Sequence, residues 1–132
     1  MPSTKVLVID DSIGMRIHLR QILESAGMVV LEAADGPEGI EMLKVNHDVD
    51  LIICDVHMPH MDGLEMLKVA HEQGLLKTIP IFMLTTELAA QHVDAAKKAR
   101  VTAWIIKPPN PKSLVATISK VLALESGMSG AR

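Results

Sequence analysis

The chain has 132 residues, 48% of them hydrophobic, and a formal net charge of -3 at pH 7. This length fits one domain over residues 1–132, with a disordered tail at about residues 127–132, and supplies enough apolar surface for a core. Direct nucleic-acid binding is not expected, because phosphate contacts need clustered Lys and Arg and the basic residues here are scattered. Without a bilayer-length apolar stretch or a signal peptide, the protein is expected to be cytoplasmic, with no membrane contact.

Short apolar runs alternate with longer stretches of helical period. After the first run, Met15, Leu19 and Ile22 recur at helical spacing, and later stretches repeat this pattern. Strands are predicted at residues 5–10, 29–33, 49–55, 79–85 and 103–107, with helices between them. Such alternation predicts an α/β fold in which a doubly wound parallel sheet has helices on both faces and right-handed crossovers.

Turn and cap residues mark the expected helix boundaries. Residues 35–38 offer an N-cap, a proline in the first turn and an acid that suits the helix dipole. Asn110 and Pro111 do the same for the last helix. Gly27 and Gly74 suit the left-handed residue that ends a helix.

Polar side chains follow four of the predicted strands. Asp10 and Asp11 close the first strand, Asp55 the third, Thr85 the fourth and Lys107 the fifth. In parallel α/β sheets ligands bind beyond the carboxyl ends of the strands, where the strand order reverses. If the first and third strands are neighbours there, the three acids converge, with the hydroxyl and the amine on the same rim.

Converging carboxylates predict a metal site. Two carboxylates about 4 Å apart repel by roughly 4 kcal/mol at an effective dielectric near 20, and a divalent cation removes that penalty. Hard oxygen ligands favour Mg²⁺ or Mn²⁺ over Zn²⁺. A zinc pair of His57 and His60 is not expected, because their loop contains Pro59 and supplies no helical face. Cys54, in the middle of an apolar strand, is expected to be inert core.

The same groups suit phosphoryl transfer. A metal, the Lys107 ammonium and the Thr85 hydroxyl can neutralise charge on the oxygens of a transferring phosphoryl group. A carboxylate is a competent nucleophile toward phosphorus and forms an acyl phosphate. Asp55 is the predicted acceptor because it stands alone at its strand end, whereas Asp10 and Asp11 are adjacent and better disposed as a metal-holding pair.

Residues 55–63, together with Asp10-Asp11, Thr85-Thr86-Glu87 and Lys107-Pro108, closely resemble the receiver domains of two-component response regulators. The likeness covers essentially the whole chain and is greatest to the single-domain, CheY-like subgroup. It implies a flavodoxin-like (βα)5 domain with strand order 2-1-3-4-5. It further implies that Asp55 accepts phosphate from a phosphohistidine on a sensor histidine kinase, and that the chain catalyses only its own phosphorylation and dephosphorylation.

The resemblance also implies roles at the metal and the phosphoryl group. Asp11, Asp55 and the backbone carbonyl of His57 would bind Mg²⁺ directly, while Asp10 would act largely through water. Lys107 would pair with the phosphoryl group.

Other implied roles concern the switch and its partners. Thr85 would swing toward the phosphoryl group, Trp104 falls at the position of the switch aromatic, and His57 and Glu87 would tune hydrolysis. Phosphorylation would repack the face made by the fourth helix, fifth strand and fifth helix, where a target, a phosphotransfer protein or a phosphatase docks. Chemotaxis or a phosphorelay is the pathway suggested by the stand-alone architecture.

Three residues depart from the family pattern. Trp104 is bulkier than the usual Tyr or Phe, Pro109 replaces the common Phe after Lys-Pro, and Arg100 stands where a small residue is frequent. These departures concern the switch and the docking face and leave the phosphorylation chemistry untouched.

Structural alternatives exist for single residues. Asp11 could be the N-cap of the first helix, Asp10 an ordinary strand-end acid and Asp55 a turn residue, and Asp62 with Gly63 is expected to be a turn and helix cap. Methionines at helical spacing are expected to be core filler more often than docking surface.

Alternative functions also remain open. One is a Mg²⁺-dependent phosphohydrolase that uses an aspartyl-phosphate, although His57 stands where such enzymes carry an acid. Another is a flavodoxin-like nucleotide or flavin binder, although the loop at residues 11–15 lacks a phosphate cradle. A phosphate-independent pseudo-receiver is a further alternative, although no site residue is missing.

Overall fold

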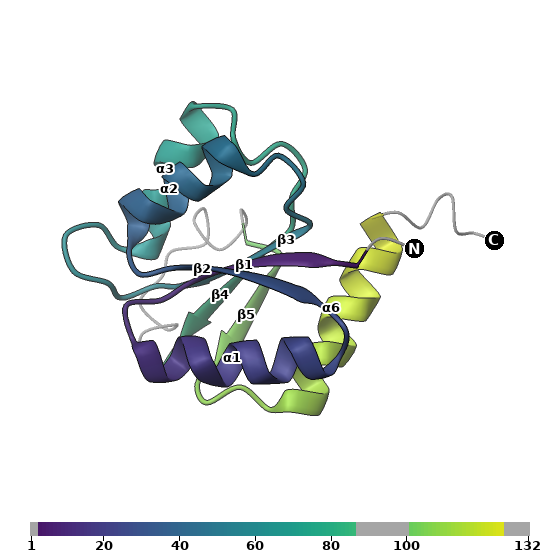
Figure 1. Cartoon of the computed structure of the whole chain (residues 1–132). Coiled ribbons are helices and arrows are strands. Elements are labelled where there is room, and N and C mark those ends of the chain that lie inside the picture. The colour runs from purple at the N-terminus through teal and green to yellow at the C-terminus, as the bar shows by residue number, and fades with distance from the viewer. Residues whose placement is uncertain (1–2, 87–100, 126–132) are drawn as a thin grey trace.

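The computed structural model describes residues 3–86 and 101–125. Five strands and four helices lie in this described part of the chain (Figure 1). The strands are β1 (Lys5–Ile9), β2 (Val29–Ala33), β3 (Leu51–Asp55), β4 (Ile81–Thr85) and β5 (Ala103–Ile106). The helices are α1 (Ile13–Ser25), α2 (Gly36–Val45), α3 (Gly63–Glu72) and α6 (Pro111–Glu125).

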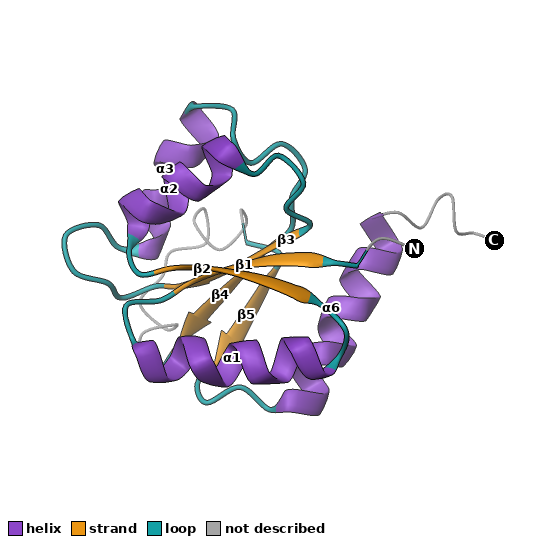
Figure 2. Cartoon of the chain, viewed as in Figure 1, coloured by secondary structure: helices purple, strands orange, loops and turns teal. Residues whose placement is uncertain are grey.

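The strands form one parallel sheet in the order β2-β1-β3-β4-β5. Figure 2 shows α2 and α3 on one face of this sheet and α1 and α6 on the other. The predicted doubly wound α/β fold and its strand order are therefore confirmed. The strand order reverses between β1 and β3, which places the expected binding edge at the centre of the sheet.

Each face of the sheet has its own hydrophobic core. Along β1, Leu7 and Ile9 pack toward α2 and α3, whereas Val6 and Val8 pack toward α1 and α6. All five positions of β3 and of β4 are buried, as expected for strands covered on both faces. Cys54 lies fully buried in the core between the sheet and helices α2 and α3, so its predicted core position is confirmed, and burial raises the pKa of its thiol.

The strands are one or two residues shorter than predicted at several ends. Asp10 lies just beyond β1 and Lys107 just beyond β5. Their backbone N–H groups still donate to neighbouring strands, Asp10 to the Ala33 carbonyl at 3.1 Å and Lys107 to the Thr85 carbonyl at 2.9 Å. Main-chain hydrogen bonds thus fix both residues at the carboxyl edge of the sheet.

Helix ends follow the predicted cap chemistry. The side-chain oxygens of Asp35 and Asn110 each accept a hydrogen bond from the backbone N–H three positions on, at 2.8 and 2.9 Å. Gly27 and Gly74 have φ values of 85° and 71°, the left-handed conformation that favours glycine. These caps end the helices where the chain turns back toward the sheet.

Some predicted features fall beyond the described residues. These are the fourth helix, Glu87, Arg100 and the tail at residues 127–132. In the described ranges, no helix has the length and apolar character needed to cross a membrane.

Candidate functional site

The three predicted acids meet at the carboxyl edge of β1 and β3. These strands pair in register up to Ile9 and Cys54, so the next residues, Asp10 and Asp55, stand opposite each other. One carboxylate oxygen from each of Asp10, Asp11 and Asp55 lies within 4.8 Å of the other two. The predicted convergence is therefore confirmed, and the fold produces it through the adjacency of β1 and β3.

Asp10 is the most deeply buried acid of this cluster, with no solvent-exposed surface. Its Oδ1 atom accepts a hydrogen bond from the Ser12 N–H at 2.9 Å, whereas Oδ2 has no hydrogen-bond partner among the described residues. Burial raises the pKa of Asp10, and the charge of Asp55 adds to this effect while the Ser12 N–H opposes it. An orphaned carboxylate oxygen at this depth costs free energy unless a cation is near it.

The donor set fits a small divalent cation. Mg²⁺ binds oxygens at about 2.1 Å, so two oxygens on opposite sides of one ion are about 4.2 Å apart. The carboxylate oxygens of the cluster lie within 4.8 Å of one another, which is a spacing of the same order. Asp10 and Asp55 are buried while Asp11 is exposed. One side of the site is thus open to water, as suits an ion that keeps several water ligands.

Lys107 and Thr85 lie on the same rim, as predicted. The Lys107 Nζ atom is 2.8 Å from Asp55 Oδ1 and 3.9 Å from Asp10 Oδ2. Thr85 is buried at the end of β4, and its hydroxyl donates to the Thr86 carbonyl at 3.1 Å. The ammonium thus already contacts the acid cluster, whereas the Thr85 hydroxyl bonds to the main chain.

Gly63 allows the start of α3 to approach the backbone of Asp55. Its N–H donates to the Val56 carbonyl at 2.8 Å, and a Cβ atom at this position would lie 2.2 Å from the Asp55 carbonyl oxygen. Asp62 accepts from the Glu65 N–H and forms a capping box with it. The prediction that Asp62 and Gly63 form a helix cap is confirmed.

Ser12, and not Asp11, is the N-cap of α1. Its hydroxyl oxygen accepts from the Met15 N–H at 3.1 Å, and its own N–H donates to Asp10. The capping alternative for Asp11 is therefore wrong. The Asp11 carboxylate belongs instead to the acid cluster.

The remaining predicted residues lie around this centre. His57 is exposed in the loop after β3, so its carbonyl ligand role and its tuning role stay predictions, and Glu87 lies outside the described residues. His60 is also exposed, and the described residues contain no histidine metal cluster. Trp104 of β5 is partly buried and packs against the core beside α2 and α3. Its Nε1 atom has no hydrogen-bond partner among the residues that the structure describes.

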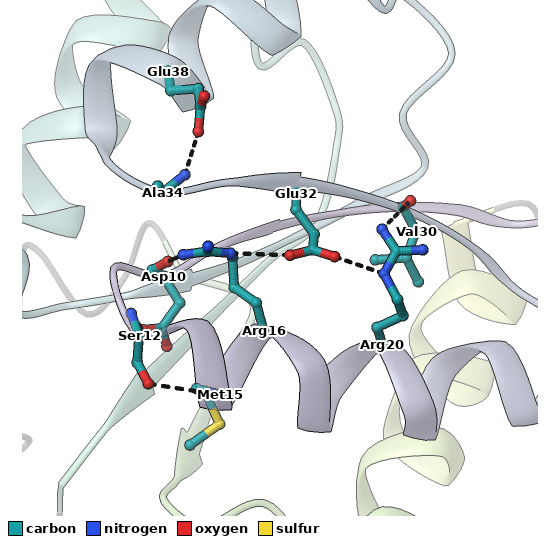
Figure 3. Close-up of polar contacts among 9 residues, drawn as sticks. All are labelled: Asp10, Ser12, Met15, Arg16, Arg20, Val30, Glu32, Ala34 and Glu38. Atoms are coloured by element: carbon teal, nitrogen blue, oxygen red, sulfur yellow. Dashed lines mark hydrogen bonds and ion pairs between the residues drawn. The ribbon is translucent and has the colours of Figure 1, made fainter.

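A set of ion pairs beside the cluster was not anticipated from the sequence (Figure 3). The Glu32 carboxylate on β2 accepts from Arg16 Nε at 3.0 Å and from Arg20 Nε at 2.6 Å. Arg16 Nη1 also donates to the Asp10 backbone carbonyl at 2.6 Å. The available signal was an acid inside an otherwise apolar strand, preceded by a helix with two arginines four residues apart.

Comparison with known proteins identifies the family. The model of the response regulator receiver domain matches residues 6–119. The chain belongs to this family. The receiver domain is 40% identical over 119 residues to chemotaxis protein CheY1 of Helicobacter pylori, covering 89% of this chain and 96% of that protein. It is 39% identical to a CheY homolog of Campylobacter jejuni, covering 96% and 98% of the two chains.

A solved structure shows the same fold. Chemotaxis response regulator CheY4 of Vibrio cholerae superposes on this receiver domain with a TM-score of 0.81 and 39% sequence identity, covering 91% of this chain and 99% of that one. Family membership favours a signalling switch over the phosphohydrolase and flavodoxin-like alternatives.

Proposed function

We propose that this receiver domain is a phosphorylation-activated switch of a two-component system, with Asp55 as the phosphoryl acceptor. One observation carries the proposal. The Asp55 carboxylate belongs to the acid cluster with Asp10 and Asp11 and is also the carboxylate that Lys107 contacts at 2.8 Å. With a cation bound to the cluster, Asp55 would therefore have a positive charge on each side, the ion and the Lys107 ammonium.

The transfer is a displacement at phosphorus. An oxygen of Asp55 attacks the phosphorus atom of a phosphohistidine, the P–N bond breaks, and its electron pair stays on the imidazole nitrogen, which takes up a proton. Asp11, Asp55 and the His57 carbonyl would hold Mg²⁺ or Mn²⁺, with Asp10 acting through water, and the bound ion would supply charge neutralisation at the phosphoryl oxygens. The Lys107 ammonium stabilises the same oxygens from the other side of Asp55.

The conformational change on phosphorylation begins with residues of β4 and β5 near the phosphoryl acceptor. Thr85 exchanges its bond to the Thr86 carbonyl for one to the phosphoryl group, and Trp104 responds on the neighbouring strand. His57 and Glu87 tune the lifetime of the phosphorylated state. The docking face includes β5, α6 and the segment before β5, part of which lies outside the described residues.

The partners follow from the family and from the relatives. A sensor histidine kinase supplies the phosphoryl group, and a separate target protein or a phosphotransfer protein receives the signal, with a phosphatase as a further partner. The chemotaxis names of the relatives make chemotaxis the proposed pathway, in the cytoplasm and without nucleic acid or membrane as direct partners. The domain, residues 1–132, catalyses only its own phosphorylation and dephosphorylation.

A small phosphodonor tests this proposal. Acetyl phosphate with Mg²⁺ is expected to add one phosphoryl group to the wild-type chain, as a base-labile adduct seen by intact-mass spectrometry. Asp55→Asn is expected to remove the adduct, and the matched variant Asp62→Asn, at the cap of α3, is expected to retain it. A wild-type chain without any mass gain, or an adduct that survives Asp55→Asn, would contradict the proposal.

A further inference from the structure

Arg16 connects the second strand to the acid cluster. It lies near the start of α1, where its side chain is only 15% exposed. One guanidinium nitrogen, Nε, donates to the Glu32 carboxylate at 3.0 Å, and another, Nη1, donates to the Asp10 backbone carbonyl at 2.6 Å (Figure 3). The planar guanidinium presents these donors in a fixed relative orientation, so Glu32 aligns the group that holds Asp10.

Glu32 is itself held in place by a second arginine. Its other oxygen accepts from Arg20 Nε at 2.6 Å, and Arg20 also pairs with Glu24 at 2.7 Å. Hydrogen bonds from Arg20 and Arg16 lower the pKa of Glu32, so the carboxylate is charged at neutral pH. Both carboxylate oxygens of Glu32 therefore accept a hydrogen bond from an arginine, and Arg16 is paired with a counterion that is held in place.

The Asp10 carbonyl belongs to the peptide bond that joins Asp10 to Asp11. On the other side of Asp10, its backbone N–H donates to the Ala33 carbonyl at 3.1 Å. The backbone of Asp10 is thus held at its N–H by β2 and at its carbonyl by Arg16, which is oriented by β2. The tilt of the peptide plane between the two acids determines where their side chains start.

We propose that Arg16, aligned by Glu32, is a positioning residue that fixes the peptide between Asp10 and Asp11 and so sets the affinity of the acid cluster for Mg²⁺. The proposal rests on the metal site of the proposed function. Arg16 is not expected to touch the ion or the phosphoryl group. It acts by pre-arranging two carboxylates that would otherwise have to be ordered when the ion binds.

Charge and position predict opposite outcomes when Arg16 is replaced. Loss of a positive charge beside an acidic cluster would, by Coulomb attraction alone, make Mg²⁺ bind more tightly. Loss of the positioning hydrogen bond would make it bind more weakly. Arg16→Met, which keeps much of the apolar stem but removes charge and donors, therefore separates the two effects by the sign of the change.

Arg20→Met is the matched control. It removes the same charge from the same helix and the same kind of bond to Glu32, but Arg20 donates to the Val30 carbonyl and not to Asp10. The dissociation constant for Mg²⁺ is measured by calorimetric titration of the unphosphorylated chains. This constant is expected to rise about tenfold in Arg16→Met, as for other residues that orient metal ligands, and to rise less in Arg20→Met, because Arg20 acts on Asp10 only through Glu32.

Urea unfolding without Mg²⁺ shows whether each variant folds. Arg16→Lys is the second variant, because it keeps the positive charge but loses the planar guanidinium with its paired donors. It is also expected to bind Mg²⁺ more weakly than Arg20→Met does. Tighter or unchanged binding in Arg16→Met and Arg16→Lys, with normal binding by the wild type, would overturn this inference alone. A wild-type chain that binds no Mg²⁺ would overturn the metal site of the proposed function as well.

Discussion

The Nζ atom of Lys107 lies 2.8 Å from Oδ1 of Asp55, although the two residues lie at the ends of β5 and β3, which are not neighbours in the sheet. The pair connects the end of β5 to the end of β3 across the end of β4. It places a positive charge on a carboxylate that is only 4% exposed. In the metal-free chain the lysine therefore compensates part of the charge that Asp10, Asp11 and Asp55 concentrate at this edge.

Lys107→Met is expected to destabilise the metal-free chain by about 1–3 kcal/mol, because it leaves the buried Asp55 carboxylate without its ion pair. Added Mg²⁺ is expected to restore more stability to this variant than to the wild type, since the ion supplies the missing positive charge. Urea unfolding with and without Mg²⁺ measures both effects. Lys44→Met, which breaks an exposed pair with Glu41, is the control. Equal losses in the two variants would contradict this account.

Asp10→Asn is expected to stabilise the metal-free chain at pH 7 by on the order of 1 kcal/mol. Burial raises the pKa of Asp10, so the folded chain binds its proton more readily than the unfolded chain does. The wild type is therefore stabilised as the pH falls through this raised pKa, and the advantage of the variant shrinks toward low pH.

Urea unfolding over a range of pH tests the Asp10 prediction. Mg²⁺ should stabilise the wild type more than Asp10→Asn, which lacks one negative charge of the cluster, so the advantage of the variant should shrink as Mg²⁺ is added. The prediction fails if the variant is less stable than the wild type at pH 7 without the ion.

Gly63→Ala is expected to destabilise the chain by about 2–4 kcal/mol, because its Cβ would lie 2.2 Å from a backbone oxygen that cannot easily move. The same displacement should slow phosphorylation, since that oxygen belongs to Asp55. Gly14→Ala on α1 is the control, because its Cβ meets nothing closer than 3.8 Å. Thermal unfolding and the rate of adduct formation are the measurements, and similar behaviour of the two variants would refute the steric argument.

Glu32→Gln is expected to cost about 1 kcal/mol at neutral pH, because it removes the charged acceptor of two partly exposed arginines. The pKa of Glu32 is lowered in the folded chain. Its contribution is therefore fully present above the unfolded pKa of about 4.3 and is lost as the pH falls through the lower folded value. Unfolding curves of variant and wild type should converge in acid, and a difference that persists there would show that charge is not the cause.

Much of the fold and of the site could be predicted from the sequence. Runs of Val and Ile mark buried strands, and Asp10, Asp55 and Lys107 lie where such runs end. Strand order was less accessible, because periodicity does not say which strands pair, and it came from the family resemblance. The sequence offered Asp11 as a possible N-cap of α1, whereas in the structure the Ser12 hydroxyl oxygen accepts from the Met15 N–H and caps the helix.

The contact between Arg16 and Asp10 could not be predicted in the same way. It depends on the position of α1 along β2. That position places Glu32 between Arg16 and Arg20, which precede it by 16 and 12 residues. The close approach of Gly63 to Asp55 is equally a matter of tertiary packing, since glycine there also suits an ordinary turn.

Trp104 gives this chain a built-in optical probe. It is the single tryptophan, and the sequence contains no tyrosine, so ultraviolet emission reports on one position of β5 without any label. Its indole N–H is shielded from solvent and lacks an acceptor among the described residues. Any rearrangement that brings water or a carbonyl to that nitrogen should shift the emission to longer wavelength, so activation can be followed in real time on the unmodified protein.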